Sequence, residues 1–217
     1  MSRRFTGRQL VTAAAALTVL VFAVIGGMML RPALISDSGS SKPALNPVEI
    51  GFSQDMLAHH QQAIEMGRMI DRPGIDDRIR TLGRQIVQEQ QYETGLMSGW
   101  LQLDGQPLSD DAPMEWMTKF AGTGQTHHGD GGDHAMPGMS TPDEVAALGS
   151  LPAQEAENNF LIQMQRHHYG GVAMCQDFLA QVPDGVVAQA ASSMMSTQTK
   201  ETGLIGVMLA ERGIQQR

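Results

Sequence analysis

A single pattern of residues occurs twice in this chain, at a constant separation of 108 positions. Each copy has a phenylalanine, a methionine, two adjacent histidines and a second methionine, followed downstream by a glutamine and a glutamate. Aligned without a gap, residues 52–105 and 160–213 share 13 identities, which favours duplication of one supersecondary unit over chance. The recurring residues are Phe52, Met56, His59, His60, Met66, Gln90 and Glu93, and in the second copy Phe160, Met164, His167, His168, Met174, Gln198 and Glu201.

Apolar residues within each copy follow the period of an α-helix. Asn46 as N-cap, followed by Pro47, predicts a helix start, and Pro73-Gly74 predicts the end of that helix. A second helix is predicted from about Ile75 to Leu103, and the second copy repeats the arrangement with Pro183-Asp184-Gly185 as its turn. The sequence therefore predicts an all-α fold, a four-helix bundle over residues 47–217 made of two duplicated helix hairpins, 47–104 and 151–213.

A long crossover, residues 105–150, joins the two hairpins and is rich in His, Met and Gly. A short helix is predicted near Pro113 to Phe120, and another is predicted to open at Thr141. Residues 122–140 contain too much glycine for regular structure.

The N-terminal segment has the features of a membrane signal. Arg3, Arg4 and Arg8 precede an uncharged, apolar stretch over residues 9–30, which is long enough to cross a bilayer. Residues 1–35 are therefore predicted to be a cytoplasmic N-terminus with a transmembrane anchor, or alternatively a cleaved signal peptide. Residues 36–46 are predicted to be a flexible tether. The bundle would then be extracytoplasmic on a single-pass anchor, or secreted or periplasmic after cleavage.

Composition limits the classes of partner. A net charge of −8 and a pI near 5.3 argue against binding to nucleic acid. The single cysteine, Cys175, excludes an intramolecular disulfide and any multi-cysteine metal site within one chain, and we expect it to be a small buried residue. With 16 methionines and only 5% aromatic residues, thioethers must fill much of the core.

Polar residues fall on the helix stripes that should face the core. They are His59, Gln90 and Glu93 in the first copy and His167, Gln198 and Glu201 in the second. Because buried polar groups need partners, two interpretations arise. In the first, Glu and His form a purely structural hydrogen-bonded network. In the second, His and Met bind a metal ion, while Glu and Gln are further ligands or orient the histidines.

The ligand types favour copper in the metal interpretation. Thioether sulfur with imidazole suits copper, especially Cu(I), whereas carboxylate oxygens suit iron or manganese. Met56, His59 and Met66 lie within about 80° around the helix, so one ion is expected to reach several of them. His60 and His168 are turned about 100° from their neighbours, and each is expected to be a ligand to a second ion at the bundle surface or an ordinary exposed histidine.

The crossover offers a further candidate metal site. Short His-rich tracts commonly bind metals, and such a loop would act as a collector or handover site. The alternative is a solvated linker whose histidines have no role. The candidate ligands are His127, His128, His134, Met136 and Met139, with Asp130 and Asp133 nearby.

Several of these motifs together resemble the bacterial family called domain of unknown function 305 (DUF305). They are Met56-x-x-His59-His60-x-x-Ala63-Ile64-x-Met66 and its second copy, the Gln-x-x-Glu segments, and Met136-Pro-Gly-Met139 followed by Thr141-Pro-Asp-Glu. The resemblance covers Val48 to about Gly213. It implies a ferritin-like four-helix fold and, for some members, periplasmic copper binding and copper resistance through Met and His. It points to Met56, His59, His60, Met66, Met164, His167, His168 and Met174 as metal ligands.

The second copy departs from the family pattern at Gly170-Gly171 and Cys175, which predicts a weaker or reshaped site there. The leading hypothesis is a membrane-tethered extracytoplasmic protein that sequesters or passes on Cu(I) or Cu(II) and is not an enzyme. One alternative is a ferritin-like iron or manganese redox enzyme, although only two stripe carboxylates are present where a di-iron centre needs about four. The other is a structural or partner-binding bundle without metal.

Overall fold

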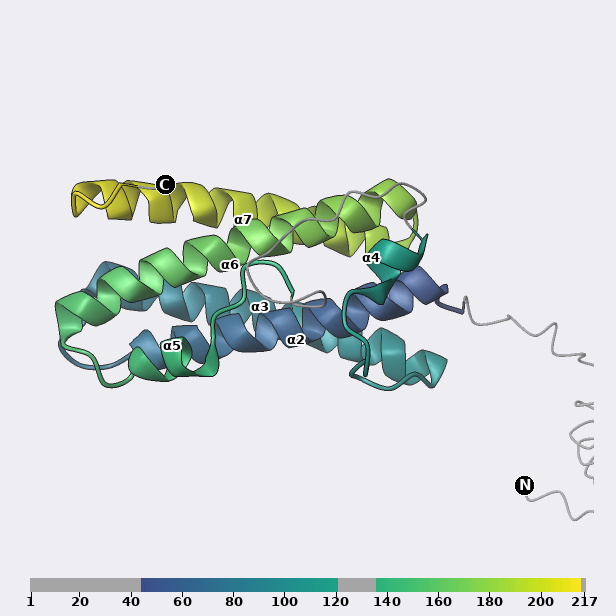
Figure 1. Cartoon of the computed structure of the whole chain (residues 1–217), viewed down its shortest axis with the longest axis horizontal. Helices are drawn as coiled ribbons and strands as arrows, with labels where there is room; N and C mark the ends of the chain where they lie inside the picture. Colours follow the sequence, from purple (N-terminus) through teal and green to yellow (C-terminus); the bar gives the residue numbers. More distant parts are fainter. Residues whose placement is uncertain (1–43, 121–135, 216–217) are drawn as a thin grey trace, which may run out of the picture. The chain divides into compact units, whose positions relative to one another are not determined.

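The computed structural model describes residues 44–120 and 136–215, which are helical or irregular and contain no strand. Residues 45–120 and 136–215 belong to one compact unit. The predicted membrane segment lies outside the described residues, and so does the predicted tether up to residue 43. Helices in the described part are α2 Pro47–Ile70, α3 Asp77–Asp104, α4 Glu115–Phe120, α5 Pro142–Ala147, α6 Ala153–Gln181 and α7 Val186–Glu211 (Figure 1).

Local capping interactions fix the ends of the long helices. The Asn46 side chain accepts hydrogen bonds from the Val48 and Glu49 amides at 2.9 and 3.0 Å, and the Glu49 carboxylate accepts one from the Asn46 amide at 2.8 Å. This reciprocal capping box confirms the predicted start of α2. α3 begins later than predicted, because the Asp76 side chain caps it by accepting from the Arg78 amide at 2.7 Å.

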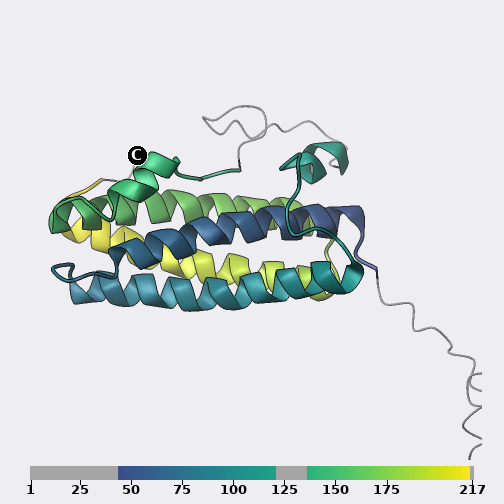
Figure 2. The ribbon, with the colours of Figure 1, turned by 90° about the horizontal axis from the view of Figure 1, so that it is seen from below.

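The four long helices are arranged as two hairpins, which confirms the prediction. α3 packs on α2 and α7 packs on α6, while α2 and α6 contact each other in the middle of the bundle (Figures 1 and 2). Each outer helix therefore packs mainly on its own hairpin partner. Within the described residues, no helix has both the length and the apolar character needed to span a bilayer.

The apolar core is divided into two clusters. One contains Met66 and Met164, and the other contains Met56 and Met174. Aromatic rings anchor the second cluster, where Phe52 stacks on Phe178 with ring centroids 4.2 Å apart. Since Phe52 belongs to α2 and Phe178 to α6, this contact sets the antiparallel register of the two central helices. The same register explains why each cluster contains one repeat methionine from each copy.

The close approach of α2 and α3 depends on glycine. A Cβ atom added at Gly67 would lie 2.6 Å from a Val87 methyl carbon and 2.9 Å from the Gly83 carbonyl oxygen. We expect Gly67→Ala to lower the free energy of unfolding by about 1–3 kcal/mol, because the helices must move apart. Chemical denaturation would measure this. Gly95→Ala on α3 is the control, since its Cβ would meet nothing within 4 Å and alanine favours the helix; equal stability changes in the two variants would contradict the prediction.

Both short crossover helices are present where predicted. The buried Asp55 carboxylate holds the α4 segment by accepting from the Met114 amide and the Trp116 indole N–H, both at 2.7 Å. Burial raises the pKa of Asp55 to about 6, against these hydrogen bonds. α5 begins with a second capping box, between Thr141 and Glu144. Residues 121–135 lie outside the described residues.

Candidate metal centre

Two histidines from different copies meet at the centre of the bundle. His59 of α2 and His167 of α6 are fully buried, and their ring centroids lie 3.7 Å apart with an interplanar angle of 31°. Burial, reinforced by the neighbouring His60, lowers the pKa of His59 to about 3. Burial and the adjacent histidines hold the pKa of His167 well below its usual value, weakly opposed by the His59 backbone. Both rings are therefore neutral at pH 7 and carry lone pairs that a metal ion can use.

The tautomer of His59 follows from its hydrogen bond. Its Nε2 lies 3.1 Å from the backbone carbonyl oxygen of Pro137. Because a carbonyl oxygen can only accept, Nε2 must carry the proton, and Nδ1 holds the lone pair. Pro137 was not among the predicted site residues, since a backbone carbonyl from a distant loop leaves no side-chain signal.

His60 and His168 are each paired with a glutamate across their own hairpin. His60 Nε2 donates to Glu93 at 2.7 Å, and His168 Nε2 donates to Glu201 at 2.6 Å. Both histidines are fully buried, so the expectation of a position at the bundle surface or in solvent is wrong. They are turned away from the α2–α6 contact, but they face α3 and α7, which cover them. The carboxylates fix the tautomer and leave Nδ1 as the free nitrogen.

The four histidines, together with Gln90 and Gln198, form what we call the central layer of the bundle. This layer contains many buried polar atoms without hydrogen-bond partners. The Gln90 and Gln198 amides make no hydrogen bond although they are 2% and 1% exposed. Such atoms are rare in folded proteins, where an ion or an ordered water usually satisfies them. In the described layer, the unpartnered atoms are Nδ1 of His59, His60 and His168, both ring nitrogens of His167, and both amide atoms of Gln90 and Gln198.

The predicted methionines are fully buried on both sides of this layer. Met56 and Met174 belong to the cluster on one side, and Met66 and Met164 belong to the cluster on the other. Met56 and Met66 are separated by ten positions, which is about 15 Å of rise along the helix. Of Met56, His59 and Met66, one ion can therefore reach at most one of the two methionines, a limit that the angular argument did not include. Each side instead combines a thioether from each copy.

The two glycines that depart from the family pattern make room for specific neighbours. A Cβ at Gly171 would lie 2.3 Å from the Gln198 amide oxygen, so glycine admits this side chain. A Cβ at Gly170 would lie 2.0 Å from the Pro137 carbonyl oxygen, so glycine admits the loop. Cys175 is buried as expected, and burial raises the pKa of its thiol to about 12. It therefore stays protonated and supplies no thiolate.

The second predicted site, in the crossover, is described only in part. His127, His128 and His134 lie outside the described residues, as do Asp130 and Asp133. Met136 packs against the cluster that contains Met56 and Met174, and Met139 is half-buried. Across residues 44–120 and 136–215, no three His, Cys, Asp or Glu side chains are gathered as a metal-ligand set. A metal in the central layer would therefore need thioether or amide ligands in addition to imidazole.

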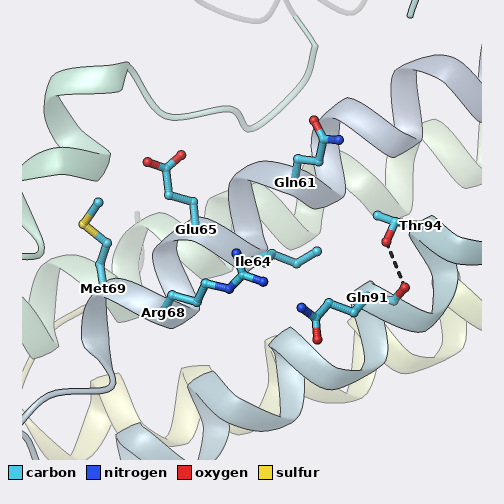
Figure 3. A pocket seen from close by; sticks show the side chains of 7 residues that line it. All are labelled: Gln61, Ile64, Glu65, Arg68, Met69, Gln91 and Thr94. Atoms are coloured by element: carbon cyan, nitrogen blue, oxygen red, sulfur yellow. Dashed lines mark hydrogen bonds between the residues drawn. The ribbon is translucent and has the colours of Figure 1, made fainter. Parts of the chain in front are cut away.

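A separate groove lies on the outer side of the first hairpin, between α2 and α3 (Figure 3). Polar and charged side chains from both helices line it, and Thr94 donates to the Gln91 carbonyl at 2.9 Å. None of the predicted site residues contributes to this groove. Its lining residues are Gln61, Ile64, Glu65, Arg68, Met69, Gln91 and Thr94.

Comparison with known proteins identifies the family. Residues 49–209, most of the chain, match the family model described as Domain of unknown function (DUF305). The chain belongs to the DUF305 family. A DUF305 protein from Streptomyces coelicolor, described as secreted, is 36% identical, with a TM-score of 0.67 over 78% of this chain and 95% of that one. A DUF305 fragment from Deinococcus radiodurans is 30% identical, with a TM-score of 0.61 over 78% and 99%.

The DUF305 fold also resembles that of CopM. In its Cu(I)-bound form CopM is 18% identical to this chain, with a TM-score of 0.56 over 75% of this chain and 96% of CopM. CopM structures are also described with Cu(II), with silver and without metal. At this identity the likeness establishes the fold. No curated protein matches the chain.

Proposed function

We propose that this protein binds copper outside the cytoplasm and sequesters it or passes it on. The observation that carries the proposal is the buried central layer, where nine imidazole and amide atoms have no hydrogen-bond partner. Unpaired buried polar atoms destabilise a fold unless a ligand satisfies them. The fully buried thioethers on both sides of the layer supply sulfur. Neutral imidazole with thioether sulfur is a donor set that suits Cu(I).

The register of α2 and α6 suggests how the donors would be shared. On one side of the layer, Met56 and Met174 would hold an ion together with Nδ1 of His59. On the other side, Met66 and Met164 would hold an ion together with His167. His60 and His168, each backed by a glutamate, and the two glutamines would be additional ligands or orient the others. Met136 and Met139, with the crossover histidines, would collect the ion first.

The comparisons support the choice of metal and the compartment. CopM shares this fold, and its structures are described with Cu(I), Cu(II) and silver, two of which are soft cations. The Streptomyces relative is described as secreted. With the basic residues before the apolar stretch over residues 9–30, this favours export, either on a membrane anchor in the lipid bilayer or after cleavage.

The site favours copper over the alternatives. A di-iron or di-manganese enzyme needs about four inward carboxylates, and the central layer has Glu93 and Glu201, each bound to a histidine. A purely structural network would satisfy its own polar atoms, whereas this layer leaves most of them unpaired. We propose binding without catalysis.

Thermal unfolding of the full-length chain tests the proposal. Cu(I) supplied under reducing conditions should raise the melting temperature, because a ligand that binds only the folded state stabilises that state. At a free Cu(I) concentration of one hundred times Kd, the free energy of unfolding rises by about 2.7 kcal/mol. Ag(I) should act similarly, and Fe(II) and Mn(II) should have little effect. A melting temperature that Fe(II) raises more than Cu(I) would favour the redox enzyme. One that no metal changes would favour the structural bundle.

A further inference from the structure

The segment Met136–Ser140, here named the strap, contacts both α2 and α6 and fits against them through its backbone. Gly138 has φ +77°, and a Cβ there would lie 2.4 Å from the Arg166 carbonyl oxygen and 3.0 Å from the His167 Cα. Gly170 on α6 is equally constrained, since its Cβ would lie 2.0 Å from the Pro137 carbonyl oxygen. Glycines on both sides thus allow the strap to reach the histidine pair.

Side chains from both central helices hold the end of the strap. The Gln62 amide of α2 accepts from the Ser140 amide at 2.7 Å and donates to the Ser140 carbonyl at 2.9 Å. Arg166 of α6 donates to the Ser140 hydroxyl at 2.9 Å and pairs with Glu144 at 3.2 Å. Ser140 is only 6% exposed. These contacts fix the position of the Pro137 carbonyl relative to the two histidines.

The strap makes the duplicated histidines chemically different. The Pro137 carbonyl accepts from His59 Nε2, whereas His167, the equivalent residue of the second copy, makes no hydrogen bond with the strap and has only a weak interaction with the His59 backbone. The positions that grip the strap are themselves repeat equivalents, Gln62 and Gly170, 108 residues apart. One copy therefore provides the amide that holds the strap, and the other provides the space that admits it.

We propose that the strap is a positioning element that gives the two histidines different roles as metal ligands. The Pro137 carbonyl fixes His59 as an Nδ1 ligand, while His167 stays free to present either nitrogen. This inference rests on the proposed function. A histidine whose second nitrogen is held by a carbonyl is oriented in advance for its metal. A histidine without such a partner adapts its ring more readily, which suits a ligand that must release the ion during transfer.

Histidine tautomers in the metal-free, full-length chain test this division. With selective ¹⁵N labelling of histidine, long-range ¹H–¹⁵N spectra distinguish the protonated nitrogen from the one with a lone pair. His59 should show the Nε2–H form alone, and His167 should show averaged signals. Signals would be assigned by comparison with His59→Gln and His167→Gln variants.

Two variants displace the strap by different means. Gly170→Ala forces the Pro137 carbonyl away from α6. Gln62→Ala removes both hydrogen bonds to Ser140 without a steric clash, so this second variant tests the proposal if the first does not fold. Gly203→Ala on α7 is the matched control, because a Cβ there meets nothing within 4 Å. In the strap variants the His59 signals should become averaged, and the affinity for Cu(I), measured against a chromogenic chelator, should fall about tenfold or more. The control should behave as the unmodified chain.

Two results would overturn the proposal. One is a His59 signal in the unmodified chain that is already averaged or is the Nδ1–H form. The other is a His59 signal that stays unchanged in both strap variants. If the unmodified chain binds no Cu(I), the proposed function fails, and the metal-free spectra still decide whether Pro137 assigns the tautomer.

Discussion

Replacing Met56 and Met164 with leucine, together with His59 and His167 with glutamine, is expected to lower the affinity for Cu(I) at least about a hundredfold. The four changes remove one thioether from each side of the central layer and both stacked imidazoles. Leucine nearly conserves the volume of methionine, and exchanges of this kind usually cost less than about 1.5 kcal/mol of stability each. Competition of the full-length chain with a chromogenic Cu(I) chelator measures the effect.

A matched control separates loss of ligands from loss of packing. Met208→Leu changes a methionine that is equally part of the core but lies outside the repeat pattern. It should leave the affinity for Cu(I) unchanged. Far-ultraviolet circular dichroism should show that both variants retain their helices. Unchanged affinity in the fourfold variant would remove the helical site from the proposal and leave the crossover residues as the binding region.

Acidification is expected to destabilise the metal-free protein strongly through its central histidines. His59 has a pKa of about 3 in the folded protein against 6.5 in an unfolded chain. Because the folded pKa is the lower one, its stabilising contribution is complete above pH 6.5 and is lost as the pH falls toward 3. At pH 4.5 the loss from His59 alone is about 3 kcal/mol, and His167 acts in the same direction.

Urea unfolding at pH 7.5 and pH 4.5 with a chelator present would measure this loss. The variant His59→Gln with His167→Gln should lose less stability between these two values, because glutamine does not titrate. Asp55, whose pKa is raised to about 6, acts in the opposite direction, since burying the protonated carboxyl favours folding at low pH. It does so in both proteins, so it cancels in the comparison. Equal pH dependence of the two proteins would contradict the prediction.

The helices could be predicted because their signals are local. Asn46 and Glu49 form a helix cap within one turn, and the apolar residues of each stripe follow the helical period. Duplication then gave the hairpin arrangement, since two equivalent amphipathic units bury their stripes against each other. The candidate residues His59 and His167 were also predictable, because histidine on an otherwise apolar stripe is conspicuous.

Other features of the site depend on contacts that no local pattern contains. His60 was expected to be a ligand at the bundle surface or an exposed histidine, because it is turned away from the main α2–α6 contact. It is buried because α2 packs on α3 as well as on α6, which covers two faces of the helix. Gly170 was recognised only as a departure from a pattern, and its role needs the position of the Pro137 carbonyl. Whether Glu93 faces His59 or His60 depends on the rotation of α3, which a stripe of residues does not fix.

The antiparallel register of α2 and α6 has a consequence for the origin of the protein. Each thioether pair, Met56 with Met174 and Met66 with Met164, takes one member from each half of the sequence. A lone ancestral hairpin would have had to associate with an identical hairpin to build the same layer, as a symmetric homodimer. Two identical hairpins would carry the same residue at this repeat position, whereas the single chain has Gln62 in one copy and Gly170 in the other.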